Sequence, residues 1–443
     1  MNTPTTIMRH STMLLVKHPV ILCLFALLWM NACTQDGRFG GEVYGSFTPT
    51  EEPLPTPREN IDQPGDDPWV DQSEFLWGLD AIHEFNLELP PAGWDALIAD
   101  PRTYVPGVFH YDGRDWDVGI RLKGALGSFR ALNSGQKCAF KVDFNYFDPA
   151  GNFFGIKKLA LNNGMQDRSF SSEYLAYKSF GALGVPVPRL GYVSLSVNDQ
   201  AWGLYMNVEV KDRRFMNMWH EDTSGNLYEG SYANAPQGGR VHPDFVADRS
   251  WAFELDVAGY PGDRGDIQAV VDRFAVNDPD DLLAAIDQHF DYDELLHLMA
   301  MEIFLTHWDG FSANTNNYHM VYTPTTGRFT ISPWGTDQTF DPNDRVDPDP
   351  RGFGPYNDLT IIFDRLLDHP QGRADYEDAM RDVIVVFESL DLADDWQQVR
   401  DLIVDAVYAD PRKNFSNSSF ESRSGQVLAF IEDQPDYMRQ WVP

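Results

Sequence analysis

Three polar residues in the second half of the chain have the types and the order needed to hold a metal ion beside a phosphate. Asp309 follows an apolar segment that we expect to be a helix, Asn317 precedes the apolar run 318–322, and Asp337 comes just after a second run, 329–332. Magnesium prefers hard oxygen ligands, which carboxylates and side-chain amides supply. An acid, a loop, an amide, a hairpin and a second acid, in this order, are typical of phosphate-transferring enzymes.

The amide role has more than one candidate. Asn314 and Asn316 lie in the same loop as Asn317 and compete with it for a metal. Asp and Asn are also common in turns and caps, so a purely structural role explains each residue equally well when it is taken alone. His307 and His319 flank the segment without the spacing of zinc ligands, so we expect them to be structural.

A lysine and a glutamate in the first half of the chain strengthen the phosphate hypothesis. Lys141 lies on the polar side of an expected strand, and Glu173 lies further along, in the first turns of an expected helix. Kinases pair a strand lysine with a helix glutamate to hold the lysine against the α and β phosphates. The alternatives are an exposed strand lysine and a solvated acid that suits the helix dipole.

The elements that must position these residues change in character along the chain. Alternating apolar and polar residues predict strands at 118–122 and 140–144, with further strands at 193–197 and 203–210. Segments of helical length and pattern are 171–183, 281–290, 292–307, 357–367, 396–409 and 424–431. Residues 230–265 lack periodicity and are expected to be loops. Strands followed by helices predict an α+β fold.

The composition limits the classes of partner. Of 443 residues, 43% are apolar, which is enough for a large core, and 67 acidic residues against 34 basic ones give a net charge of −33. Such a surface repels the phosphates of nucleic acids and of anionic lipids. We therefore expect no nucleic-acid partner, and the acidic surface is explained by solubility or by a cationic partner.

The N-terminus has the pattern of an export signal. Basic residues precede an apolar run at 20–30, which is too short to be a comfortable membrane span and ends just before Cys33. The pattern resembles a bacterial lipoprotein signal, with residues 1–32 removed and Cys33 lipidated. Residues 33–73, rich in proline and acids, are expected to be a tether. The expected location is the cell envelope, with the membrane contacted only through the lipid, and ordinary secretion is the alternative.

Several blocks of sequence, in order, resemble the CotH spore-coat kinase family. They are VGIRLKG (118–124), FKVDF (140–144), FFGIKKLALNNG (153–164), SSEYLAYKSFGALGVPVPR (171–189), WGLYMNVE (202–209), GNLYEG (225–230), NNYHMVY (316–322) and PWGTDQTF (333–340). The resemblance covers residues 85–364. Many blocks in the same order are far more specific than any one of them.

This resemblance implies a fold and an activity. The fold is a two-lobed, atypical protein-kinase-like fold over residues 74–443, with a strand-rich N-terminal lobe (74–229) and a mainly helical C-terminal lobe (230–443). The activity is a metal-dependent protein Ser/Thr kinase that uses ATP with Mg²⁺ or Mn²⁺. Matching positions carry the following roles: Asp309 as the catalytic or metal-proximal acid, Asn317 and Asp337 as metal ligands, Lys141 and Glu173 as the phosphate-holding pair, and Arg121 and Lys123 as further phosphate contacts.

The chain departs from the family pattern at one acid. Many relatives have PWDxD where this chain has Gly335 in place of the first acid. The sequence also lacks a glycine-rich phosphate loop of the usual kinase form, so backbone amides of residues 125–136 would have to replace it. A catalytically inactive kinase fold that serves as a surface binding, adhesion or coat protein is therefore the alternative function. For an active kinase, the acidic surface suits an exported acceptor protein that is basic and serine-rich.

Overall fold

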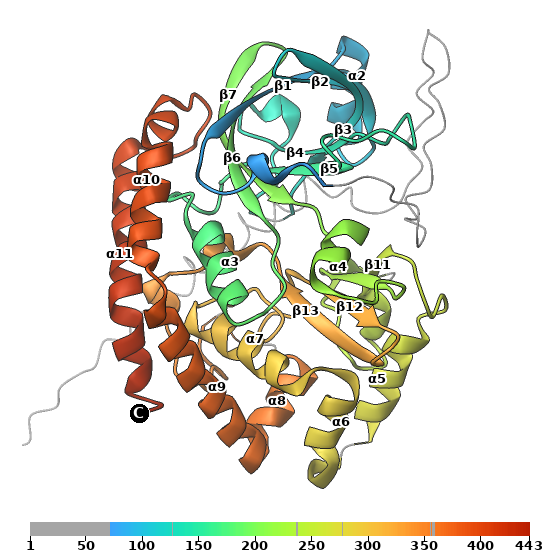
Figure 1. The fold of residues 1–443 in the computed structure, drawn as a ribbon, viewed down its shortest axis with the longest axis vertical. Coiled ribbons are helices and arrows are strands. Elements are labelled where there is room, and N and C mark those ends of the chain that lie inside the picture. Colours follow the sequence, from blue (N-terminus) through green and yellow to red (C-terminus); the bar gives the residue numbers. More distant parts are fainter. Residues whose placement is uncertain (1–70, 126, 236–237, 277, 355, 357–358) are drawn as a thin grey trace, which may run out of the picture. The chain divides into compact units, whose positions relative to one another are not determined.

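In the computed structural model, which describes residues 71–443 except 126, 236–237, 277, 355 and 357–358, the first half of the chain forms a closed barrel (Figure 1). Its strand order is β1-β2-β3-β4-β5-β7-β6, and the parallel pairing of β1 with β6 closes it. The expected signal peptide, Cys33 and nearly all of the expected tether lie outside the described residues.

The barrel strands follow the alternation of the sequence. They are β1 (Ile82–Glu88), β2 (Val105–Tyr111), β3 (Arg114–Lys123), β4 (Ala139–Asp143), β5 (Lys158–Asn162), β6 (Leu190–Val197) and β7 (Gln200–Glu209). Val118, Ile120 and Leu122 of β3 are fully buried in the barrel core, so the intervening polar residues face the other side. In the antiparallel register Arg121 pairs with Lys141, which places both on one face.

A second sheet lies in the later half of the chain. Its strands are β11 (Glu254–Val257), β8 (Leu227–Gly230), β12 (Tyr318–Thr323) and β13 (Arg328–Pro333), in this spatial order. The lobe boundary expected between residues 229 and 230 therefore falls inside β8, a strand of this sheet. Residues 230–265, expected to be loops, also contain β9 (Ala233–Asn234), β10 (Arg240–Val241) and β11, so that prediction was wrong in part.

Helices make up most of the later part of the chain, and together with the two sheets they confirm the expected α+β class (Figure 1). They are α4 (Arg213–Trp219), α5 (Gly265–Ala275), α6 (Leu282–His289), α7 (Tyr292–Phe304), α8 (Ile361–Asp368), α9 (Pro370–Ser389), α10 (Leu392–Ala409) and α11 (Asn417–Arg439), with α2 (Pro91–Ala99) and α3 (Ser172–Ala182) earlier in the chain. The long helix α9 was not predicted. Within the described part of the chain, each helix is too short or too polar to cross a bilayer.

Buried contacts join the barrel to the C-terminal helices. Helix α10 packs against β7, and the ammonium of Lys137, just before β4, forms an ion pair of 2.6 Å with Asp410 at the end of α10. Both side chains are almost fully buried. Helix α7 packs against α9 and α3, so the helix that precedes Asp309 is fixed on more than one side.

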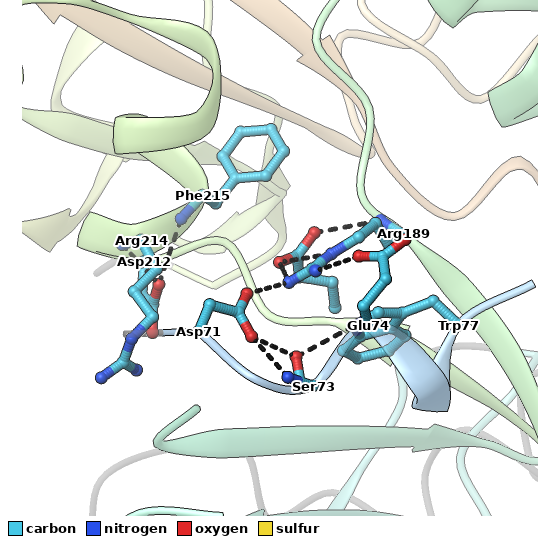
Figure 2. Close-up of polar contacts among 9 residues, drawn as sticks. Asp71, Ser73, Glu74, Trp77, Arg189, Asp212, Arg214 and Phe215 are labelled. Carbon is cyan, nitrogen blue, oxygen red and sulfur yellow. Dashed lines mark hydrogen bonds and ion pairs between the residues drawn. The ribbon is translucent and has the colours of Figure 1, made fainter. Parts of the chain in front are cut away.

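Arg189 anchors the beginning of the described chain to the barrel (Figure 2). Its guanidinium contacts Asp71, Glu74 and Glu209 at 2.6, 3.1 and 2.6 Å and lies 5.0 Å from the ring centre of Trp77. Glu209 is the last residue of β7 and its side chain is 5% exposed. This network therefore fixes the point where the chain leaves the barrel for α4.

Candidate active site

A cleft of about 560 Å³ collects charged side chains from the barrel and the second sheet. Its basic residues are Arg102, Arg121, Lys123, Lys141, Lys211 and Arg240, and its acids are Glu229, Asp256, Asp309 and Asp337. The whole chain has 34 basic against 67 acidic residues, so the cleft concentrates positive charge that the rest of the protein lacks. Such a lining suits a polyanion bound together with cations.

Asp309 lies in the loop after α7 and is held by the three amides that the sequence pointed to. Asn314 and Asn316 donate to its Oδ1 at 2.6 and 3.1 Å, and Asn317 donates to its Oδ2 at 2.7 Å. Burial raises the pKa of Asp309, and these hydrogen bonds offset part of that effect. Three donors hold the carboxylate in one orientation and favour its charged form.

The amides differ in what they leave available for a ligand. Asn316 uses both ends, because its Oδ1 also accepts the backbone N–H of Tyr232 at 3.2 Å. Asn317 donates through Nδ2, so its Oδ1 points away from Asp309, and within the described residues no donor hydrogen-bonds to it. Asn317 also has a left-handed φ of 49°, which asparagine tolerates better than most residues. The geometry favours Asn317 over Asn316 as a metal ligand.

Glu302 supports the backbone of the Asp309 loop from α7. Its fully buried carboxyl group accepts the backbone N–H groups of Phe311 and Ser312 at 2.9 and 2.7 Å. A Cβ on Gly310 would lie 2.3 Å from Glu302 Oε1, so a side chain there would displace the carboxyl group. Burial raises the pKa of Glu302 to about 7.

Asp337 lies among other carboxyl groups. It belongs to the short turn Thr336–Gln338, which follows β13 and packs against α3. Burial and the nearby carboxylates of Glu173, Asp167 and Asp309 raise the pKa of Asp337 well above its usual range. A group in this position favours a proton or a cation. Asp309 and Asp337 both line the cleft, and the charge of Asp309 acts on Asp337.

Glu173 lies beside Lys123, not beside Lys141 as expected. Its buried carboxylate accepts from Asn162 Nδ2 at 3.1 Å and from the Tyr177 hydroxyl at 3.0 Å. The ammonium of Lys123 donates to the oxygen of the same Asn162 amide, which therefore links the two charges. Burial raises the pKa of Glu173, and the charge of Lys123 counteracts that shift.

Lys141 lies in the same wall of the cleft but faces different acids. In the register of β3 and β4 it pairs with Arg121, whereas Lys123 pairs with Ala139, so the two lysines stand at different levels of the sheet. Burial lowers the pKa of Lys141 to about 8, against the charges of Asp256 and Glu229. The three basic residues expected to contact phosphates thus line one cleft, but Lys123 takes the position expected for Lys141.

The segment after β3 also reaches the cleft. Gly124, Ala125, Gly127 and Ser128 line it, and the Ser128 hydroxyl accepts the N–H of Ala125 at 3.1 Å. That these backbone amides cap a nucleotide stays a prediction.

Several residues that line the cleft were not predicted from the sequence to belong to the site. Asn162 ends strand β5 in a block that resembles the family, which was the available signal. Lys211 is buried between the barrel and α4 and donates to the carbonyl of Pro333 at 2.6 Å, a contact that no local pattern indicates. Glu229 and Asp256 come from separate strands that only the sheet brings together.

Comparisons with known proteins agree with the blocks of sequence. The model of the CotH kinase protein family matches residues 120–442. Inner spore coat protein H of Bacillus subtilis (strain 168) is 21% identical over 373 residues, which cover 81% of this chain and 95% of that protein. The crystal structure of the Helicobacter pylori proinflammatory kinase CtkA aligns with 76% of this chain and 89% of its own at 12% identity, but its TM-score of 0.31 is too low to support an argument. Because the family model matches well over half of the chain, the protein belongs to the CotH kinase family.

Proposed function

We propose that the protein is an atypical protein kinase that transfers the γ-phosphate of ATP to Ser or Thr residues of exported proteins. The observation that supports it most is the meeting of six basic side chains with Asp309 and Asp337 in one cleft of a strongly acidic protein. Membership of the CotH kinase family supports the same reaction class.

The residues present fit a divalent metal ion and a triphosphate. Asp309, Asn317 and Asp337 offer hard oxygen atoms of the kind that Mg²⁺ and Mn²⁺ prefer. A metal ion bound there would supply charge neutralisation of the phosphates. Lys123, held through Asn162, and Arg121 would contact the phosphate oxygens from the barrel side.

Asp309 is proposed to orient the acceptor hydroxyl. Of the roughly four acceptor positions of its carboxylate, about one stays open beside the three amide bonds, and the amides prevent it from rotating. In kinases an aspartate in this loop accepts the proton of the attacking hydroxyl.

The two lobes are proposed to be the barrel with α3 and the remaining sheet with its helices. Strand β7 ends at Glu209 and α4 begins at Arg213, so the link between lobes would be residues 210–212. Val210 and Lys211 of this link line the cleft, as expected for a site between lobes.

Gly335 favours a second candidate, a kinase fold that binds a partner without catalysis. Its φ is 56°, and a Cβ there would lie 3.1 Å from Cγ of Asn317. An acid at this position would place a carboxylate beside the proposed metal ligand, and this chain lacks it. The two candidates differ in phosphate transfer rather than in the fold.

The test is transfer of labelled γ-phosphate to the protein itself or to a basic, serine-rich peptide, in Mg²⁺ and in Mn²⁺. Asp337→Asn should lower the rate at least about 100-fold, because it removes a metal ligand. Asp341→Asn, which removes a neighbouring acid outside the cleft lining, should leave it unchanged. Nucleotide binding without transfer in the unaltered protein would favour the second candidate, and a rate that Asp337→Asn leaves intact would contradict the proposed site.

Export and lipid anchoring through Cys33 are also proposed, on the signal-like pattern of residues 1–33. Cys33→Ser should move the protein from the membrane fraction to the soluble fraction of the producing cell. Retention in the membrane fraction would contradict the anchor.

A further inference from the structure

Three metal-binding side chains from three neighbouring strands meet in the cleft, outside the set proposed for catalysis. Glu229 lies on β8, Asp256 on β11 and His319 on β12, and one ligand atom of each lies within 4.8 Å of the others. Strand β8 is the middle one, and its Glu229 pairs in register with His319. All three residues line the cleft.

Within the described residues, the buried imidazole of His319 makes one long contact, to Asp256, and no short hydrogen bond. The residue is 6% exposed, Nε2 lies 3.5 Å from Oδ2 of Asp256, and Nδ1 has no partner within the described residues. Ordinary N–H···O bonds measure about 2.7–3.2 Å, so the contact with Asp256 is long. A buried ring that points at two carboxylates without a short hydrogen bond is suited to bind a cation between them.

Two lysines offer a competing explanation for the acids. The charges of Lys141 and Lys211 both act on Glu229 and Asp256, so these carboxylates also balance buried ammonium groups. Charge balance alone does not require an imidazole, and it leaves both ring nitrogens of His319 without a good partner. His319 is therefore the residue that favours a metal site over a network of salt bridges alone.

We propose that Glu229, Asp256 and His319 form a second divalent-cation site, suited to Zn²⁺. One imidazole and two carboxylates are typical ligands of this ion and less typical of magnesium. With bonds of about 2.1 Å, ligand atoms in a tetrahedral site lie about 3.4 Å apart, so side-chain movements of roughly 1 Å complete the geometry. Three protein ligands leave a fourth position for water or for a ligand in the cleft.

The ion would tie together the strands beneath the Asp309 loop. Strand β12 begins at Tyr318, directly after Asn317, and His319 would link it to β8 and β11. Binding at this site requires neither nucleotide nor phosphate transfer. A failure of the proposed kinase activity would therefore leave this metal site untouched, and the reverse also holds.

The experiment is a calorimetric titration of the full chain with Zn²⁺ in the absence of nucleotide. Asp337→Asn serves as the parent protein, because it weakens the catalytic metal set. His319→Gln and Glu229→Gln are then added singly, and Glu254→Gln is the matched control, since Glu254 lies on β11 opposite Glu229 but outside the three ligands. Titration with Co²⁺, followed by its visible absorption, reports the coordination number of the site, and a change of that spectrum in His319→Gln shows that the imidazole is a ligand.

We expect the parent to bind one equivalent of Zn²⁺ that both ligand variants weaken at least about 100-fold and Glu254→Gln leaves unchanged. Zn²⁺ should also raise the midpoint of thermal unfolding of the parent but not of the ligand variants. No binding by the parent, or equal binding by a folded His319→Gln variant, would overturn the proposal. Circular dichroism shows which variants are folded, and Glu229→Gln carries the test if His319→Gln is not.

Discussion

Replacing Glu302 with glutamine tests whether the Asp309 loop rests on a buried carboxyl group. Glu302 accepts two backbone N–H groups, from Phe311 and Ser312, at 2.9 and 2.7 Å. Even when it is protonated, a carboxyl group keeps acceptor lone pairs on both oxygens, whereas glutamine offers one oxygen and turns an NH₂ group toward the other N–H. We expect Glu302→Gln to lose one bond and leave one buried N–H unpaired, at a cost of about 1–3 kcal/mol at pH 5.

The cost should change with pH in a defined direction. Burial raises the pKa of Glu302 to about 7 from its usual value of 4.5, so the folded protein binds the proton more tightly than the unfolded chain. The stabilisation from this group is complete below about pH 4.5 and is lost as the pH rises through 7. At about 1.4 kcal/mol per pKa unit, wild type should lose roughly 2–3 kcal/mol between pH 5 and pH 8 through this group, whereas glutamine loses nothing.

Differential scanning calorimetry of wild type and Glu302→Gln at several pH values between 5 and 8 measures this pH-dependent difference in stability. An unfolding entropy of about 2.1 cal/mol/K per residue over roughly 370 residues converts this loss into about 3 °C. The unfolding midpoint of Glu302→Gln should therefore rise by about 3 °C relative to wild type across the range. Glu84→Gln, at an exposed position of β1, is the control and should show no such trend. A constant difference for Glu302→Gln would refute the reasoning.

Three further substitutions follow from the same geometry. Lys123→Met should weaken ATP binding more than Lys141→Met, because Lys123 is the lysine linked to the buried glutamate of α3. Equal losses of affinity in parallel calorimetric titrations would contradict this placement. Arg189→Met should lower the thermal midpoint by about 4 °C, or about 3 kcal/mol, because it leaves the Glu209 carboxylate buried without its guanidinium partner. Adding Glu209→Gln to the same chain should restore part of this loss, and no recovery would contradict the pairing. Gly335→Asp should lower the free energy of unfolding by less than about 1 kcal/mol, since aspartate tolerates a φ of 56°. It should also tighten Mn²⁺ binding in calorimetry, and an unchanged affinity would show that a carboxylate here does not reach the metal.

Local patterns predicted the barrel strands β3, β4, β6 and β7 and the Asp309 loop, whereas β1, β2 and β5 were not predicted. Val118, Ile120 and Leu122 alternate with polar residues, and burial on one face of a strand produces that alternation. Asp309 and the three asparagines lie within a few residues of one another, so a single loop brings them together. The family of the chain was also recognisable, because its sequence blocks are local and ordered.

Contacts set by register and by sheet pairing could not be predicted in the same way. Lys123 and Lys141 both lie on polar strand faces, and only the register of β3 against β4, with the packing of α3, decides which one approaches Glu173. Glu229 and Asp256 are distant in sequence and meet through β8 and β11.

The missed helix α9 has a different cause. Its buried residues Tyr376, Met380, Val383 and Phe387 recur at helical spacing, so the pattern was present. Pro370 and Gly372 at its start are weak helix formers outside a first turn, which obscured where the pattern begins.

We propose that the cleft binds a nucleotide through its phosphates together with a metal ion. Calorimetric titration of the full chain with ATP, ADP and AMP, with and without Mg²⁺ or Mn²⁺, tests it most directly. We predict an affinity that increases with the number of phosphates, requires the metal, and falls in Asp337→Asn but not in Asp341→Asn. Equal affinity for ATP and AMP without any metal requirement, or no binding of any nucleotide, would contradict the claim.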